Sequence, residues 1–210
     1  MSDKDAVVAR IREVGVLPVV RAASADGALR ATDALLAGGL PLAEITLTVP
    51  GAIALIGRLA RERSEVLVGA GSVTDAGAAR ACVEAGARFI VCPALDLEIV
   101  AYCRSQHVTV LPGALTPTEV VAAWNGGADF VKVFPVGALG GPAYIRSLKA
   151  PLPQAELVPT GGVTRSNVAD YIAAGAAAVG AGADLTAGSA EQVSAAARAY
   201  VEAVRAARKA

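Results

Sequence analysis

Two charged residues lie inside otherwise apolar segments, where they could do chemistry. Lys132 lies in Phe-Val-Lys-Val-Phe-Pro, which ends at Pro135, and Glu44 lies in Ala-Glu-Ile-Thr-Leu, which ends at Leu47. Burial favours the neutral form of a lysine, and a neutral amine attacks a carbonyl carbon to form a Schiff base. A carboxyl group can then move protons between water, the carbinolamine and the enamine. The pair predicts imine chemistry on a keto acid, and a purely structural Glu44–Lys132 ion pair is the alternative.

Two glycine-containing segments are suited to holding a phosphate group. Thr160, Gly161 and Gly162 follow one apolar segment, and the segment 180–184 ends another. Backbone amides and a helix N-terminus can bind phosphate without a basic side chain. Taken singly, such glycines could also be merely tight turns, but their joint occurrence after two successive apolar segments is more specific. A third segment, 69–73, lacks the spacing of a dinucleotide fingerprint or a Walker motif, so neither NAD nor ATP is expected.

Repeated βα units must position these residues. Glycine pairs and Gly-Ala pairs near positions 38, 86, 126 and 175 each end an Ala-rich stretch and precede a short apolar segment. Glycine is the preferred residue just after a helix, and segments that are apolar on both faces are typical of buried parallel strands. The pattern predicts strands near Leu17–Arg21, Ala43–Leu47, Val66–Gly69, Phe89–Cys92, Thr109–Leu111, Phe130–Phe134, Glu156–Pro159 and Ala178–Gly180.

Helix starts fit the same scheme. Ser24, Thr74, Thr116 and Ser166 stand where N-caps are expected, and Thr116-Pro-Thr-Glu has the form of a capping box. A helix at Asp3–Val14 precedes the first strand, and a last helix is expected over Ala190–Ala207.

Eight strand–helix alternations within 210 residues predict one domain, residues 1–210, folded as an α/β protein: a (β/α)₈ TIM barrel with an extra N-terminal helix. An open doubly wound sheet is the alternative, because it also contains repeated βαβ units.

The composition indicates a protein that binds small molecules. Nineteen basic residues balance nineteen acidic ones, so no net charge favours nucleic acid or an anionic membrane, and hydrophobic residues make up 54% of the chain. The first residues do not resemble a signal peptide and no apolar segment is long enough to span a bilayer, so a cytoplasmic protein is expected.

Three cysteines without motif spacing are expected to be buried thiols, and the single histidine, His107, is expected in a surface loop. No metal site or cofactor is predicted.

Taken in order along the chain, these motifs resemble the 2-keto-3-deoxy-6-phosphogluconate (KDPG/KHG) aldolase family, whose members are class I aldolases. The resemblance extends from Val16 to Leu185. Its carriers are Val19–Ala22, Ala37–Gly39, Glu44–Leu47, Gly69–Val73, Pro112-Gly113, Thr116–Glu119, Lys132–Pro135, Gly141-Pro142 and Pro159–Val163.

The resemblance implies a role for each site residue. Lys132 matches the Schiff-base lysine and Glu44 the general acid/base, and both are catalytic. The implied reaction cleaves a phosphorylated 2-keto-3-deoxy acid reversibly into pyruvate and glyceraldehyde 3-phosphate, without a metal, in a protein that is typically a homotrimer. The implied substrate-binding residues are Arg21, Thr46, Thr48, Ser72, Pro93, Phe134, Thr160, Gly161, Gly162, Gly182 and Ala183.

Three positions depart from the commoner family pattern. Thr48 stands where many members have an arginine, Ala183 where a serine often helps to hold phosphate, and Ser72 where threonine is commoner. The first two bear on the substrate, so 2-dehydro-3-deoxy-6-phosphogalactonate and 4-hydroxy-2-oxoglutarate stay open beside the gluconate-derived substrate. A sugar-phosphate isomerase or epimerase, and a non-catalytic trimeric scaffold, are alternatives from other classes.

Overall fold

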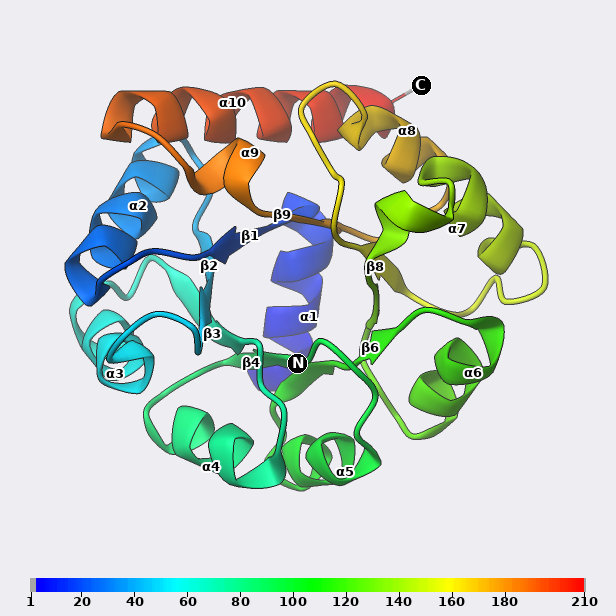
Figure 1. Cartoon of the computed structure of the whole chain (residues 1–210), viewed down its shortest axis with the longest axis horizontal. Coiled ribbons are helices and arrows are strands. Elements are labelled where there is room, and N and C mark those ends of the chain that lie inside the picture. The colour runs from blue at the N-terminus through cyan, green and yellow to red at the C-terminus, as the bar shows by residue number, and fades with distance from the viewer. Residues whose placement is uncertain (1–2, 210) are drawn as a thin grey trace.

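The computed structural model describes residues 3–209, which form a ring of parallel strands surrounded by helices (Figure 1). The strands are β1 Val16–Val20, β2 Leu42–Thr46, β3 Leu67–Gly71, β4 Phe89–Val91, β5 Thr109–Leu111, β6 Gly113–Ala114, β7 Val131–Val133, β8 Leu157–Pro159 and β9 Val179–Ala181. The helices are α1 Asp3–Val14, α2 Ala25–Ala37, α3 Ala52–Glu62, α4 Ala76–Glu84, α5 Leu97–Ser105, α6 Pro117–Asn125, η1 Val136–Leu139 (a 3₁₀ turn), α7 Pro142–Lys149, α8 Val168–Ala173, α9 Ala183–Thr186 and α10 Ala190–Ala207.

The strands close into the predicted (β/α)₈ barrel. One set pairs in the order β5-β4-β3-β2-β1-β9 and the other in the order β6-β7-β8. Pro112 separates β5 from β6, because proline has no N–H for the ladder, yet its carbonyl still accepts a hydrogen bond from the Lys132 amide at 2.9 Å. The two segments therefore act as one barrel strand. A parallel bridge between Thr160 and Gly180 joins β8 to β9 and completes the ring.

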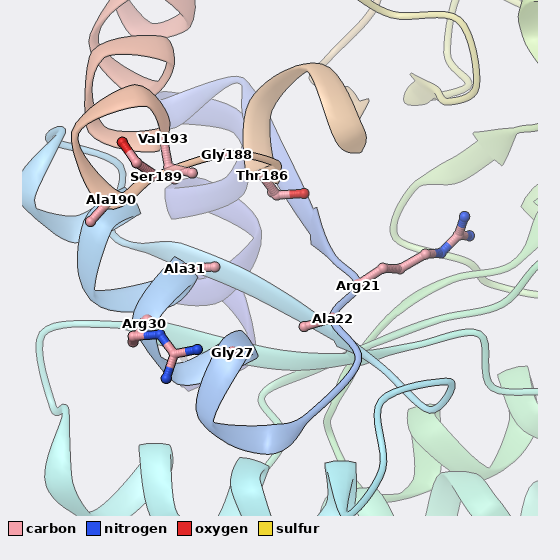
Figure 2. Close-up of a pocket in the computed structure, with 10 residues that line it drawn as sticks. All are labelled: Arg21, Ala22, Gly27, Arg30, Ala31, Thr186, Gly188, Ser189, Ala190 and Val193. Atoms are coloured by element: carbon pink, nitrogen blue, oxygen red, sulfur yellow. The ribbon is translucent and has the colours of Figure 1, made fainter.

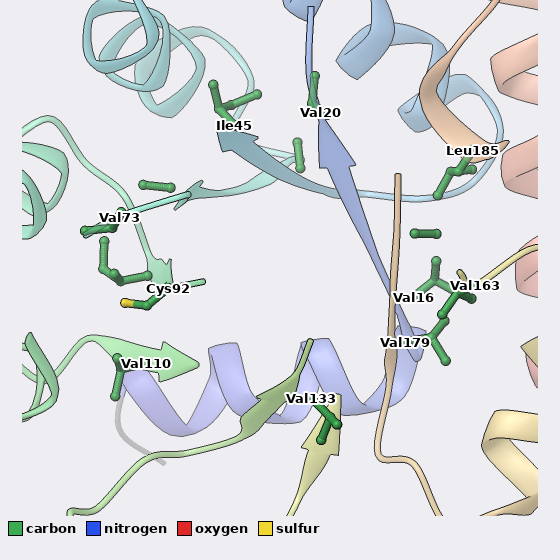
Figure 3. Close-up of a cluster of buried hydrophobic side chains, with 14 of the residues drawn as sticks. Val16, Val20, Ile45, Val73, Cys92, Val110, Val133, Val163, Val179 and Leu185 are labelled. Atoms are coloured by element: carbon green, nitrogen blue, oxygen red, sulfur yellow. The ribbon is translucent and has the colours of Figure 1, made fainter. Parts of the chain in front are cut away.

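Strand alternation divides the apolar side chains into two layers. Val16, Val20, Ile45, Val133 and their equivalents point outward, where the helices cover them (Figure 3). The alternate residues point into the barrel, because successive side chains of a strand lie on opposite faces. The inner apolar set comprises Leu17, Leu42, Phe89, Val91, Leu111, Phe130, Val158 and Ala178.

Helix α1 closes one end of the barrel. It crosses the ring in Figure 1, and its buried residues Val7 and Ile11 pack with the inner apolar set. Arg208, just beyond α10, donates hydrogen bonds to the carbonyls of Arg12, Glu13 and Ala177, which fixes the end of α1 against the barrel. The interior is therefore solid at this end, and space for a ligand can exist only toward the opposite, C-terminal end of the strands.

Most predicted boundaries are confirmed to within one or two residues. The helices Asp3–Val14 and Ala190–Ala207 are as predicted, and Gly39, Gly86, Gly127 and Gly175 adopt positive φ after the helices that they terminate. Strand β3 runs to Gly71 rather than ending at Gly69, because its glycines belong to the ladder instead of the following turn.

Two of the four predicted N-caps are confirmed, and two are wrong. Ser24 and Thr116 cap α2 and α6 as predicted, and Thr116 forms the expected capping box with Glu119. Thr74 is not a cap, since Asp75 accepts the amide hydrogen of Ala78 at 2.7 Å. Ser166 is not a cap either: α8 follows Asn167, whose side chain instead accepts a hydrogen bond from the Thr164 amide. In both cases another polar residue, one position further on, lies immediately before the helix.

Within residues 3–209, no helix has the length and apolarity needed to cross a membrane.

Candidate active site

Glu44 on β2 and Lys132 on β7 both point into the barrel. Glu44 is two residues after the inward-facing Leu42, and Lys132 is two residues after the inward-facing Phe130. The period of two along a strand therefore places both side chains one level above the apolar plug. They are 1% and 5% exposed, respectively. The predicted chemistry-bearing pair is thus brought into one enclosed space.

The environment of Glu44 is poor in hydrogen-bond donors. Its buried Oε1 atom has no hydrogen-bond partner within residues 3–209. Burial raises the pKa of the Glu44 carboxyl, while the positive charges of Lys132 and Arg21 lower it to a smaller extent. Within the same residues no ion pair joins Glu44 to Lys132 directly, so the structure gives the purely structural alternative no support. An unpartnered carboxyl oxygen in a barrel interior is suited to exchanging protons with a ligand.

Glycines on the neighbouring strands make room for the inward side chains. A Cβ added at Gly71 on β3 would overlap the carboxyl group of Glu44, and one added at Gly180 on β9 would overlap the side chain of Thr160. Sequence reasoning missed Gly71 as a site residue and treated Gly180 only as part of a phosphate-binding segment. The available signal was a glycine inside an apolar strand, which often marks a close approach of another group.

Apolar side chains flank Lys132. Its Nζ atom lies 4.9 Å from the centre of the Phe134 ring, which follows β7 and is half-buried. Pro93, also half-buried, follows β4, and a Cβ on Gly113 of the adjacent β6 would meet its backbone. Pro93 and Phe134 therefore occupy positions consistent with apolar walls near the amine.

Polar residues lie at the ends of β1, β2 and β3. The hydroxyl of Thr46 is buried, donates to the carbonyl of Val20 at 3.1 Å and lies 2.8 Å from the hydroxyl of Thr48. Thr48 and Arg21 are exposed, and the charge of Arg21 acts on Glu44. Ser72 is half-buried at a positive φ of 58°. This edge of the barrel mouth can supply hydroxyl groups and one guanidinium to an anion.

The two predicted phosphate segments lie side by side after β8 and β9. The bridge between Thr160 and Gly180 joins their strands, and Gly161 and Gly162 both have positive φ. The side-chain amide of Asn167 donates to the carbonyl of Gly162 at 2.9 Å, which fixes the first segment. In the second segment Gly182 is half-buried, and the exposed Ala183 begins the short helix α9.

A separate cavity of about 320 Å³ opens beside the barrel mouth, between the end of β1, α2 and the start of α10 (Figure 2). Its lining includes Arg21, Arg30 and Thr186. In Figure 2 the Arg21 side chain extends away from the other labelled side chains. Because Lys132 and Glu44 do not line it, this cavity is a neighbour of the candidate site and not the site itself.

The three cysteines are buried thiols and the histidine is exposed, as predicted. Cys82, Cys92 and Cys103 are free and buried, and burial raises the thiol pKa to about 11 for Cys82 and about 12 for the other two. His107 is exposed at the turn before β5. Over residues 3–209, no group of three or more histidine, cysteine or acidic side chains is placed to hold a metal ion.

Comparison with known proteins identifies the family of the chain. The family model for KDPG and KHG aldolase matches residues 7–202. The chain is 38% identical to the 2-dehydro-3-deoxy-phosphogluconate aldolase of Pseudomonas aeruginosa over 162 residues, 77% of this chain and 74% of that protein. It is 36% identical to the 2-dehydro-3-deoxy-6-phosphogalactonate aldolase of Escherichia coli over 198 residues, 90% of this chain and 96% of that protein.

A solved structure of a relative is also closely similar. The KDPG aldolase of Legionella pneumophila, with pyruvate captured as a covalent carbinolamine intermediate, superposes with a TM-score of 0.81 at 27% identity, covering 99% of this chain and 98% of that one. Fold and matches together define a carbon–carbon lyase, an aldolase built on a (β/α)₈ barrel. The chain belongs to the KDPG and KHG aldolase family.

Proposed function

We propose that this aldolase reversibly cleaves 2-dehydro-3-deoxy-6-phosphogluconate into pyruvate and D-glyceraldehyde 3-phosphate, through a Schiff base on Lys132. The observation that carries the proposal is the inward placement of Lys132 and Glu44 at one level of a barrel whose opposite end is closed. An amine and a carboxyl group in a space shielded from water are the two groups that imine chemistry needs.

The proposed cleavage uses each group in turn. The neutral Nζ of Lys132 attacks the C2 keto carbon, and the carbinolamine hydroxyl takes a proton from the Glu44 carboxyl and leaves as water to give an iminium ion. Glu44 removes the proton of the C4 hydroxyl, the C3–C4 bond breaks, and its electron pair moves toward the iminium nitrogen to form an enamine. The aldehyde leaves, C3 takes a proton back from Glu44, and hydrolysis of the resulting iminium ion releases pyruvate, restores the amine and returns a proton to Glu44.

The remaining predicted residues are proposed to bind the substrate. Ser72, Arg21, Thr46 and Thr48 lie at one edge of the mouth and would hold the carboxylate, with Thr48 supplying a hydroxyl and no charge. Pro93 and Phe134 would contact the carbon chain. Because a phosphate can be bound by backbone amides, the proposed phosphate site consists of Thr160, Gly161, Gly162, Gly182 and Ala183.

A substrate derived from galactonate is the second candidate. The relative with that specificity is matched over 90% of this chain, a larger share than the 77% matched to the Pseudomonas relative. The two substrates differ in the configuration at C4, one of the two carbons of the bond that breaks. Steady-state cleavage of both epimers, each with and without the phosphate, decides between them: the higher kcat/KM identifies the substrate.

Trapping with borohydride tests the Schiff base itself. Incubation with pyruvate and sodium borohydride is expected to add one pyruvyl group to Lys132, located by peptide mass spectrometry. Lys132→Ala should lose both the label and nearly all cleavage activity. Wild-type protein that stays folded and unlabelled would contradict the proposal, as would appreciable cleavage by Lys132→Ala.

We also propose that the chain acts as a single domain over residues 1–210 in a cytoplasmic homotrimer. Several large apolar side chains are exposed, among them Leu97 at 52% and Leu139 at 42%, and such surfaces are often covered by a partner subunit. Light scattering coupled to size exclusion should give three times the chain mass of 20.9 kDa, and a monomer mass would exclude the trimer.

A further inference from the structure

A partly buried hydrogen-bond cluster ties together the two loops proposed to hold the substrate phosphate. Asp184, the second residue of α9, follows the Gly182–Ala183 turn, and Arg165 lies on the loop that follows β8. The Asp184 Oδ2 atom accepts hydrogen bonds from the Arg165 amide at 3.0 Å and from the Tyr200 hydroxyl at 2.9 Å, and the Arg165 Nε lies 3.4 Å from it.

Tyr200, on helix α10, contacts both loops. Its side chain projects from α10, is fully buried, and places its hydroxyl 2.9 Å from Asp184 Oδ2 on one loop and 3.4 Å from the Val163 carbonyl on the other. Val163 directly follows Gly162. The hydroxyl and carboxylate therefore help to fix the separation of the two loops, which the bridge between Thr160 and Gly180 also joins.

That separation matters because the proposed phosphate site has little else to define it. Its members are glycines, one buried threonine and Ala183, which has no polar side-chain atom. Backbone amides bind an anion well only when they are held in place before it arrives, because ordering a loop during binding reduces affinity. Gly161 and Gly162 both have positive φ. Because glycine restricts the backbone less than other residues do, these two positions do little by themselves to hold the loop in one conformation.

We infer that Asp184 and Tyr200 are positioning residues that set the affinity for the phosphate end of the substrate. They touch neither the reacting carbons nor Lys132; they hold the Gly162 and Gly182 amides at a fixed spacing. This inference rests on the proposed function and deepens it. It predicts that the two residues affect phosphorylated substrates and leave the Schiff-base step alone.

The test compares a substrate with and without its phosphate. Tyr200→Phe removes one buried hydroxyl and keeps the ring, so the fold should survive. We expect KM for the phosphorylated substrate to rise about tenfold, the effect of losing a hydrogen bond to a charged group. We expect kcat to change by less than about twofold, and KM for the unphosphorylated 2-keto-3-deoxygluconate to stay the same.

Two further variants complete the experiment. Asp184→Asn keeps the shape but removes the charge, and should show the same selective rise in KM. Tyr171→Phe is the matched control, because Tyr171 is a buried tyrosine on α8 whose hydroxyl makes no hydrogen bond within residues 3–209, and it should leave both substrates unaffected. Equal changes for both substrates in Tyr200→Phe and Asp184→Asn, or no change for either, would overturn the inference. Pyruvate–borohydride labelling of Lys132 reports separately on the proposed function.

Discussion

Gly71 on β3 leaves free the space that the carboxyl group of Glu44 on β2 occupies. The two residues are two positions out of register, since Glu44 pairs with Gly69 and Thr46 with Gly71, so the Glu44 side chain leans along the strand direction over the glycine. The missing side chain at position 71 thus determines where the proposed proton-transfer group can lie.

Gly71→Ala should therefore inactivate the protein without unfolding it. The added methyl group would displace the carboxyl, and a general base that moves by about 1 Å loses on the order of 100-fold in rate. We expect kcat to fall by that order in a steady-state cleavage assay. The control is Gly57→Ala on the outer helix α3, where the added methyl group would lie 3.3 Å from the end of the flexible Arg61 side chain, which can move, and in ordinary contact with Ala85. Near-wild-type kcat in Gly71→Ala would show that Glu44 is not held by this contact.

Glu44→Gln should abolish turnover and stabilise the protein increasingly as pH rises. Because burial raises the pKa of Glu44 in the folded protein, the carboxyl ionises more readily in the unfolded chain. The stability that it contributes is complete below its ordinary pKa of 4.5 and decreases as pH rises toward the folded value. The difference in Tm between the variant and the wild type should accordingly be smallest near pH 4 and grow toward neutrality. A difference that shrinks over this range would mean that the positive charges of Lys132 and Arg21 outweigh burial.

Glu119→Gln should show the opposite dependence. The Glu119 carboxylate accepts hydrogen bonds from the amides of Leu115 and Thr116, which lower its pKa. Its contribution is present above the ordinary pKa of 4.5 and is lost as pH falls through the lower folded value. The wild type should be more stable than the variant at pH 7, and the two should converge in acid. Thermal denaturation at both pH values measures this, and identical stabilities at pH 7 would contradict it.

Thr109→Val should raise stability and leave activity unchanged. The Thr109 hydroxyl is fully buried on β5 and has no hydrogen-bond partner within residues 3–209. Replacing an unsatisfied hydroxyl with a methyl group removes a desolvation cost of about 1 kcal/mol or more. Urea denaturation should show a higher midpoint with the same slope. A lower midpoint would indicate that the hydroxyl has a partner, such as a bound water molecule.

Patterns of glycine and apolar residues predicted most of the fold. The helix-ending glycines and the short apolar strands are local signals, so the order of elements, the helix before β1 and the last helix follow from the sequence. The sequence did not predict the separation of β5 and β6 at Pro112. It also did not predict the helix starts at Asp75 and Asn167, because in each case two neighbouring polar residues compete for one cap and only the backbone path decides between them.

The candidate site was predictable where a residue type was out of place. Lys132 and Glu44 are conspicuous in apolar strands, and strand periodicity turns both inward. Asp184 and Tyr200 carry no such signal, since an aspartate and a helical tyrosine are ordinary where they stand, and Gly71 gives only the weaker signal of a glycine inside an apolar strand. Their importance depends on contacts between elements far apart in the chain, such as Tyr200 on α10 with Val163 after β8, and those contacts appear only in three dimensions.

Closure of the barrel by α1 imposes an order on catalysis. Val7 and Ile11 block the end behind Lys132, so everything that enters or leaves passes through one opening. In the proposed mechanism, the three-carbon keto fragment is still covalently attached to Lys132 after the carbon–carbon bond breaks, and the aldehyde lies between it and that opening. The aldehyde must depart first, and water can reach the imine only afterwards. In the synthetic direction the same geometry makes pyruvate the leading substrate and requires kinetics in which the aldehyde binds second.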